Sequence, residues 1–575
     1  MDRERLVQLF FFVAAILILT IFSKPGTLLA GPPDASQSAK VDQLFHSWNS
    51  PASPGCAVAI MKDGQIAYEH GYGMADLEHE AKITPATVFN VGSIAKQFTA
   101  TAILMLVQEG KISLDDPIRK YIPELPDFGT PITLREMLRH TSGLRDYEQL
   151  LYFDGWRLDS PDLLTDSDVM YIMTRQKELN FPPGSDFAYS NTNYYLLAQV
   201  VSRVSMQSFP DFTMTRLFQP LGMKHTHFRD DHGEVIKNVA YSYITKDGAF
   251  HLCLPNYDIF GATNLFTTVE DLARWEENFY TAKVGGPQVV RLLQEPGALN
   301  DGTFINYAPG MFVSAPSAPR WAQSGTAGDA GYRADVFRLP DHHLSAITLC
   351  NLGSIDPSAL DTRIAEIYLG TKLSVIIGAD ESAPAASFHP DSERLGAYAG
   401  TYADQGENLI LKFDLRGDSL WGEWFMGAGD VGPAQLEAMS ENRFRGLGMK
   451  IDFGKDPNHR ELTADPLGMP SVPYRRVPDY RPTASELRGF AGVYSSKELD
   501  VPTYLTLEGD KLVLHPPKAP EIVLAPLAND LFVGGDRHVR FTRDSQKKVS
   551  GLLMSGLWNR VRNLRFERLP EQSTH

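Results

Sequence analysis

The chain has 575 residues, and a prior of about one domain per 150 residues predicts three or four domains. Its composition, 43% hydrophobic and 22% charged, excludes a disordered, collagen-like or polytopic membrane protein. The net charge of −16 argues against binding to a phosphate backbone, so no nucleic-acid partner is expected. The three cysteines, Cys56, Cys253 and Cys350, are too few and too far apart for a disulfide framework or a zinc knuckle.

The N-terminal segment is typical of an export signal. Arg3 and Arg5 precede an apolar run of 14 residues over 9–22, which is short for a membrane-spanning helix. Ala30 supplies the small residue that a cleavage site needs. Residues 1–30 are therefore predicted to be a signal peptide, with an uncleaved membrane anchor as the alternative. Both predict an exported chain, periplasmic or extracellular, and the second adds membrane attachment through the apolar segment.

Residues 40–377 alternate strand-like and helix-like segments. Two apolar runs flank Lys62-Asp63-Gly64, which predicts a β-hairpin. Residues 94–109 are apolar on nearly all sides and end at Gly110, which predicts a buried helix. A strand is expected again at 344–349. With strands at both ends and helices between them, this segment is predicted to be one α+β domain whose sheet joins both ends.

The C-terminal third contains an internal repeat after a linker expected over 378–392, which is rich in Ala, Ser, Pro and Asp. The sequence Leu395–Tyr402 returns as Leu487–Tyr494, 92 residues further on, and Leu415–Leu420 returns as Leu507–Leu512 at the same offset. Both copies show short alternating strands broken by Gly-Asp turns. Residues 393–480 and 485–571 are therefore predicted to form two small antiparallel β-barrel-like domains.

One of two Ser-x-x-Lys sequences lies where catalysis is feasible. Ser93-Ile94-Ala95-Lys96 opens the apolar helix, so burial and the positive end of the helix dipole both favour a neutral Lys96. A neutral amine beside Ser93 can accept the proton of its hydroxyl and make the serine a nucleophile. The alternative is that Ser93 caps the helix and Lys96 is exposed. The second sequence, 545–548, is polar and is predicted to be a surface turn.

A second candidate element is Tyr189-Ser190-Asn191. It follows a loop signature at 182–185 and precedes a helical stretch over 194–204. A loop tyrosine near a lysine can pass a proton to a leaving group, and an asparagine beside it can hold a substrate amide. The alternative is a helix cap with a half-buried tyrosine.

Ser93-x-x-Lys96 followed by Tyr189-x-Asn191 resembles the serine β-lactamase and penicillin-binding-protein superfamily, over about residues 40–372. Leu134–Leu144 and Asn264–Trp275 are similar to its class C-like branch. The resemblance implies a β-lactamase/transpeptidase-like catalytic domain, with an antiparallel sheet flanked by helices. The domain order is similar to that of bacterial D-aminopeptidases. For His140, Thr141 and Ser142 a structural role near the site is expected.

The chain departs from the family at the third motif. The family places Lys-Thr-Gly or His-x-Gly beside the serine, and the matching residues here are Gln323, Ser324, Gly325 and Thr326. Gln323 carries no charge, so recognition of a substrate carboxylate is in doubt. The backbone amides of Ser93 and Thr326 are expected, by analogy, to form the oxyanion hole. Arg333 either restores a positive charge nearby or forms a surface salt bridge.

The resemblance implies a serine hydrolase. Ser93 is expected to attack an amide or ester carbonyl, with Lys96 as general base and Tyr189 passing a proton to the leaving group. Asn191, Gln323, Ser324, Gly325 and Thr326 are the expected substrate-binding residues. No cofactor or metal is expected. The expected partner is a small-molecule or short-peptide substrate, D-aminopeptidase-like, with a plain esterase, a β-lactamase or a D,D-peptidase as alternatives. The non-enzyme alternative is an inactive binding protein. The oligomeric state is not predicted.

Overall fold

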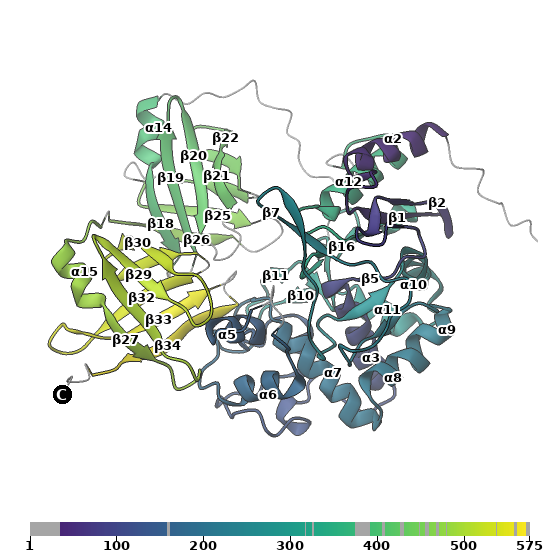
Figure 1. The fold of residues 1–575 in the computed structure, drawn as a ribbon, viewed down its shortest axis with the longest axis horizontal. Helices are drawn as coiled ribbons and strands as arrows, with labels where there is room; N and C mark the ends of the chain where they lie inside the picture. Colours follow the sequence, from purple (N-terminus) through teal and green to yellow (C-terminus); the bar gives the residue numbers. More distant parts are fainter. Residues whose placement is uncertain are drawn as a thin grey trace, which may run out of the picture.

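The computed structural model describes residues 35–157, 162–316, 318–324, 327–373, 392–404, 409–425, 431–447, 449–454, 459–466, 471–478, 480–535, 537–556 and 560–570. The export segment over 1–30, nearly all of the expected linker, and Gly325 and Thr326 lie outside these residues. Within the described ranges, no helix is both long and apolar enough to cross a membrane. Figure 1 shows a mixed helix and sheet domain on one side and two β-rich units on the other.

The first domain is built on a sheet with strand order β12-β13-β14-β16-β17-β1-β2, to which β15 adds by pairing with β16. Every pair is antiparallel. The strands are β1 (Cys56–Lys62), β2 (Gln65–Tyr72), β12 (Tyr307–Ala308), β13 (Met311–Val313), β14 (Ala322–Gln323), β15 (Ala327–Asp329), β16 (Tyr332–Leu339) and β17 (Leu344–Cys350). Because β1 pairs with β17, the sheet joins both ends of the domain, as the sequence predicts.

The predicted hairpin is the β1–β2 pair, and its turn residues Asp63 and Gly64 both have positive φ, as a type I′ turn requires. One expectation was wrong in part: Cys56 and Cys350 form a disulfide, although 294 residues separate them. They are directly opposed on β1 and β17, so the fold removes the separation that the sequence shows. Cys253 is buried and free.

Helices cover both faces of this sheet. On one face α3 (Ala95–Gln108) runs through the core and packs on α7 (Asn191–Ser205). On the other face α12 (Pro357–Leu369) packs against β16 and β17, with α2 (Ala35–Phe45) beside it. Along β1, the alanines at 57 and 59 join the first core, and Val58 and Ile60 join the second. Burial of both faces explains why this strand is apolar throughout.

The domain that the structure describes has further α-helices, and the one over Val269–Thr281 also packs against β1 and β17. They are α4 (Leu134–Leu138), α5 (Tyr147–Phe153), α6 (Asp166–Thr174), α8 (Phe209–Thr213), α9 (Gln219–Leu221), α10 (Val269–Thr281) and α11 (Gly286–Leu293). Small strands complete it: β3 (Met74–Asp76), β4 (Ala81–Lys82), β5 (Phe89–Asn90), β6 (His227–Phe228), β7 (Tyr243–Lys246), β8 (Ala249–Leu252), β9 (Leu265–Thr267), β10 (Gly297–Ala298) and β11 (Phe304–Ile305).

The two C-terminal units are antiparallel β structures, which confirms the predicted fold class. The first is a nine-stranded sheet in the order β21-β20-β19-β18-β26-β25-β24-β23-β22, and the second, β27–β34, is a closed barrel. Their strands are β18 (Gly400–Asp404), β19 (Ile410–Arg416), β20 (Ser419–Phe425), β21 (Val431–Gln435), β22 (Glu437–Ala438), β23 (Arg443–Gly446), β24 (Met449–Asp452), β25 (Glu461–Pro466), β26 (Val472–Val477), β27 (Gly492–Ser495), β28 (Thr503–Glu508), β29 (Lys511–His515), β30 (Ile522–Ala528), β31 (Leu531–Gly534), β32 (Arg537–Arg543), β33 (Val549–Gly556) and β34 (Val561–Arg568).

The 92-residue offset is structural as well as sequential. Each unit opens with a short helix, α14 (Ser392–Tyr398) or α15 (Ala484–Phe490), 92 residues apart. In each unit an arginine on the last strand donates to the carbonyls that follow this helix. Arg476 donates to Ala399 O, and Arg568 donates to Ala491 O. Both units therefore use one device to tie the first helix to the last strand.

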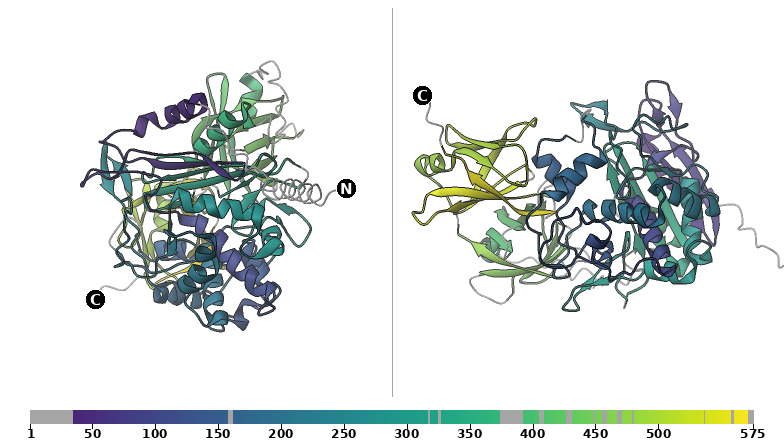
Figure 2. Two further views of the ribbon diagram at one scale, coloured as in Figure 1. Left: turned by 90° about the vertical axis from the view of Figure 1, so that its right-hand side faces the viewer. Right: turned by 90° about the horizontal axis from the view of Figure 1, so that it is seen from below.

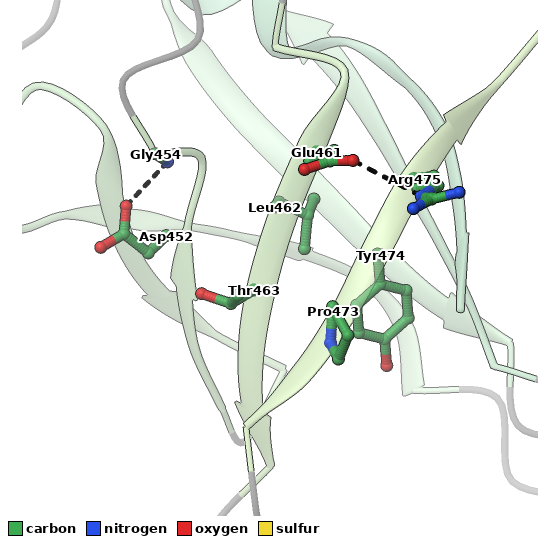
Figure 3. A pocket seen from close by; sticks show the side chains of 8 residues that line it. All are labelled: Asp452, Gly454, Glu461, Leu462, Thr463, Pro473, Tyr474 and Arg475. Carbon is green, nitrogen blue, oxygen red and sulfur yellow. Dashed lines mark hydrogen bonds and ion pairs between the residues drawn. The ribbon is translucent and has the colours of Figure 1, made fainter. Parts of the chain in front are cut away.

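The units differ in their neighbours. Figure 2 shows the closed barrel beside the helical part of the first domain. Ala403 and Ile410 of the first unit pack on Leu527, Leu531 and Val533 of the barrel. The first unit also has a hollow of about 430 Å³ between β24, β25 and β26, where Glu461 and Arg475 form an ion pair (Figure 3). None of the expected site residues lines this hollow.

Candidate active site

Ser93 lies in a 3-10 turn, Gly92–Ile94, that leads directly into α3. Gly92 has a φ of +50°, and a Cβ on it would lie 2.9 Å from the carbonyl oxygen of Gly328 on β15. Only glycine fits both the left-handed backbone and this close approach. The turn is thereby packed against β15, which directly follows the expected third motif.

Lys96 is completely buried in the first turn of α3. Its Nζ lies 2.9 Å from Ser93 Oγ, 2.9 Å from Asn191 Oδ1 and 2.7 Å from Ala262 O. The alternative of an exposed lysine is therefore wrong. Burial lowers the pKa of Lys96, and the nearby Tyr189 opposes this shift. A lowered pKa favours the neutral amine, which is the form that a general base beside a serine hydroxyl needs.

Tyr189 lies in the loop before α7, and its ring centroid is 4.9 Å from Lys96 Nζ. The ring of His140 lies 4.3 Å from that of Tyr189, and His140 Nδ1 accepts a hydrogen bond from the backbone of Ser190. Burial holds the pKa of His140 well below its usual value. A neutral histidine thus supports the tyrosine loop, which agrees with the structural role expected of it.

Asn191 is the first residue of α7 and links the site to α5. Its Oδ1 accepts from Lys96, and its Nδ2 donates to Glu148 Oε2 at 2.8 Å. Its backbone amide donates to Asp146 Oδ2 at 2.6 Å. The amide group of Asn191 is thus oriented from both ends, beside the amine of Lys96.

The described side chains of the third motif, Gln323 and Ser324, bond to a different partner from those of the first two motifs. The Gln323 amide donates to Asp335 Oδ2, and the Ser324 hydroxyl donates to Asp335 Oδ1, each at 2.8 Å. Burial raises the pKa of Asp335 to about 6. Among the described residues, Gln323 bonds to this carboxyl group and not to Ser93, Lys96 or Tyr189. The structure therefore brings together Ser93, Lys96, Tyr189 and Asn191, and leaves the side chain of Gln323 outside their contacts.

Comparison with known proteins shows to which family the chain belongs. The Beta-lactamase family model matches residues 41–369, more than half of the chain. The chain belongs to the beta-lactamase family. It is 24% identical over 541 residues to a D-aminopeptidase of Brucella anthropi, covering 90% of this chain and 96% of the relative. It is 29% identical over 419 residues to penicillin-binding protein 4* of Bacillus subtilis, covering 69% and 89%.

Among solved structures, the octameric penicillin-binding protein homologue from Pyrococcus abyssi has a TM-score of 0.52 and 22% identity, covering 76% of this chain and 100% of that one. This likeness shows the fold. The predicted family is therefore confirmed, and the chain is a serine hydrolase of the beta-lactamase family.

This member of the beta-lactamase family has a charged group at its site that the sequence did not reveal. Arg560, in the connection between β33 and β34 of the closed barrel, places its guanidinium carbon 5.0 Å from the centroid of the Tyr189 ring. Its Nη1 lies 3.8 Å from Glu148 Oε2. Its backbone oxygen accepts from the amides of Asp146 and Asn180, at 3.1 and 2.9 Å. The barrel is thus bonded to the segment that orients Asn191.

Two carboxyl groups near the site were also missed. Burial raises the pKa of Glu148, while Arg560 and Lys96 lower it. Burial, and then the charge of Glu148, raises the pKa of Asp329 to about 8. Asp329 ends β15 and accepts a hydrogen bond from Thr263. Neither residue belongs to a motif; only the position of Glu148 shortly after His140-Thr141-Ser142, in the first turn of α5, could have indicated it.

Arg333, which the sequence offered as a substitute cation, is largely engaged with its own turn. Its Nη1 donates to the backbone oxygens of Ala330 and Tyr332, at 3.0 and 2.6 Å. These bonds are neither the surface salt bridge nor the positive charge beside Ser93 that were expected for Arg333 from the sequence. Arg560, more than 200 residues later in the chain, is the arginine that lies against Tyr189.

Proposed function

We propose that the chain is an exported hydrolase that cleaves an amide or ester bond through an acyl-enzyme on Ser93. The observation that carries this proposal is the distance of 2.9 Å between Ser93 Oγ and the Nζ of a fully buried lysine. Lys96 removes the proton of Ser93 as the oxygen attacks the carbonyl carbon. The C–N or C–O bond then breaks, and Tyr189 passes a proton to the leaving group. Water releases the acyl group in a second step.

The oxyanion of the tetrahedral intermediate needs two donors that are fixed before the reaction. The backbone amide of Ser93 is one proposed donor, and that of Thr326, at the end of the third motif, is the other. The positive φ of Gly92 and its close approach to Gly328 support this arrangement, since they hold the serine turn against the strand that follows Thr326.

The proposed substrates are amides or esters of D-amino acids. Support comes from the D-aminopeptidase of Brucella anthropi, because that likeness extends over 90% of this chain and so includes both β units. Penicillin-binding protein 4* matches over a smaller share, 69%, and keeps D,D-peptidase or β-lactamase activity as the second candidate. The export proposal rests on the apolar run over 9–22, and the Cys56–Cys350 disulfide is compatible with an oxidising compartment.

A substrate panel tests this proposal. D- and L-aminoacyl p-nitroanilides, short acyl p-nitrophenyl esters and nitrocefin are incubated with the full chain and with the Ser93→Ala variant. We expect hydrolysis of the D-aminoacyl compounds to exceed that of their L-counterparts, and all hydrolysis to depend on Ser93. Preference for nitrocefin would favour the second candidate, and equal turnover by Ser93→Ala would rule out the acyl-enzyme.

A further inference from the structure

Several arginines lie at the contact between the closed barrel and the catalytic domain, and two of them are closely paired with a carboxylate across it. Arg145 Nη1 donates to Glu498 Oε2 at 2.7 Å, with 1% and 5% of the two side chains exposed. Arg562 Nη1 donates to Asp186 Oδ2, also at 2.7 Å. Short charge-assisted bonds of this kind fix the barrel on the catalytic domain.

Arg560 is different. Only 22% of its side chain is exposed, and its Nε, like those of Arg145 and Arg562, is buried without a hydrogen-bond partner among the described residues. Within the described part of the chain, its nearest carboxylate oxygen is Glu148 Oε2 at 3.8 Å, which is beyond hydrogen-bond distance. Its other contact is with the face of the Tyr189 ring. A guanidinium has five N–H donors in a planar fork, and here none of them forms a hydrogen bond with another of the described residues.

We propose that Arg560 is a specificity-determining residue that binds a carboxylate on the leaving group of the substrate. This inference rests on the proposed function of Ser93, Lys96 and Tyr189. Tyr189 is the residue that protonates the leaving group, and Arg560 lies against its ring, so the guanidinium faces the leaving-group side. Arginine and carboxylate form planar, bidentate pairs, which explains why an arginine suits this place.

The placement of Gln323 makes this proposal specific to the chain. The residue that stands where the family has a cation is uncharged and bonds to Asp335, so it offers no positive charge to an anionic substrate. Arg560 supplies a positive charge from another domain instead. Glu148 accepts from Asn191 and stands at 3.8 Å from the guanidinium, so it keeps Arg560 beside the site without occupying its donors.

The test uses two esters that differ in one charge: the acetyl esters of 3-hydroxybenzoate and of 3-hydroxybenzamide. The readout is the ratio of their kcat/KM values. For the wild type we expect a ratio of about ten or more in favour of the carboxylate, since a hydrogen-bonded ion pair contributes about 1.5–3 kcal/mol. In Arg560→Gln the ratio falls to about one, and in Arg560→Lys, which keeps the charge but not the fork, it is intermediate.

Arg562→Gln is the matched control, because it removes a guanidinium from the same contact that is already paired with Asp186. It should lower both rates by a similar factor and leave the ratio at the wild-type value. Equal loss of both activities in Arg560→Gln, or a wild-type ratio near one, would overturn the proposal. Labelling by a fluorophosphonate separates the two levels: a wild type that is not labelled refutes the proposed function itself, and a labelled wild type with a ratio near one refutes only the role of Arg560.

Discussion

The two β units have the same frame, but among the described residues only the second forms ion pairs with the catalytic domain. Four charged residues of the barrel form ion pairs with that domain, Glu498, Asp500, Arg560 and Arg562, and their counterparts 92 residues earlier carry no charge. These counterparts are Gly406, Asn408, Gly468 and Pro470. A fifth charged residue, Arg537, lies over the rings of Tyr152 and Phe153, and its counterpart Arg445 is charged. The frame, with Arg476 or Arg568 tying the last strand to the first helix, is common to both units.

The comparison shows that folding and docking are encoded separately in the repeat. The residues that close each unit are shared, so they are required by the β structure itself. The residues that form ion pairs with the catalytic domain differ between the units, and one of them, Arg560, contacts Tyr189. The second unit is therefore part of the active-site region, and the first unit packs on the second through Ile410 and Leu531.

The largest effect is expected at Lys96 itself, which belongs to the catalytic domain. Lys96→Ala should lower the acylation rate by about 10²–10⁴, the usual contribution of a general base, because no other described residue bonds to Ser93 through a buried amine. Stopped-flow measurement of acyl-enzyme formation checks this. A near-normal rate would remove Lys96 as the base.

The next effect concerns the docking of the barrel. Glu498→Gln removes the carboxylate that lies 2.7 Å from the buried Arg145, and breaking such a buried pair costs about 3–5 kcal/mol. We expect a lower midpoint of thermal unfolding and a loss of activity on every substrate. The control is Glu461→Gln, which removes an ion pair of the first unit whose side chains are 69% and 79% exposed, and it should change neither quantity. Equal effects of the two changes would contradict the assignment of docking to the second unit.

A smaller effect distinguishes the bonds that hold each β unit together from the contacts that dock the barrel on the catalytic domain. Arg476→Ala and Arg568→Ala each remove the bonds between the last strand and the first helix of one unit. Each should destabilise its own unit by about 1 kcal/mol. Only Arg568→Ala should also lower activity, because Arg568 lies on β34, the strand that follows Arg560. Calorimetry and a hydrolysis assay check the two expectations. A comparable loss of activity in Arg476→Ala would show that both units act on the site.

The smallest effect is on pH dependence. Burial lowers the pKa of Lys96, and the charges of Arg560 contribute in the same direction. The amine acts as a base above its pKa, so acylation falls as the pH drops through that value. In Arg560→Gln one positive charge is lost, the pKa of Lys96 rises, and the falling limb moves to higher pH. Arg475→Gln in the first unit is the control and should leave the profile in place.

The sequence predicted those parts of the site that lie close together in the chain. Ser93 and Lys96 are three residues apart at the start of a helix, so helix geometry alone places them together. The 92-residue repeat revealed two β units because each is a local structure. The Cys56–Cys350 disulfide was not predicted, since it depends on strands from both ends of a domain becoming neighbours.

Arg560 could not be predicted for the same physical reason. Its contact with Tyr189 spans 371 residues and depends on how one folded domain docks on another. The hydrogen bond from Gln323 to Asp335 could not be predicted from the motif either, because strand register determines which residue lies opposite Gln323. Motif spacing thus indicated the residues proposed for the reaction, and the docked barrel supplied Arg560 beside them.

The position of a covalent adduct tests the central claim most directly, that Ser93 is the nucleophile of a site completed by the second β unit. The full chain is treated with a fluorophosphonate and digested, and the modified peptide is identified by mass spectrometry. We predict one adduct, on Ser93, formed rapidly by the wild type and by Glu461→Gln and slowly by Glu498→Gln. An adduct on another residue, or equal rates in all three proteins, would contradict the claim.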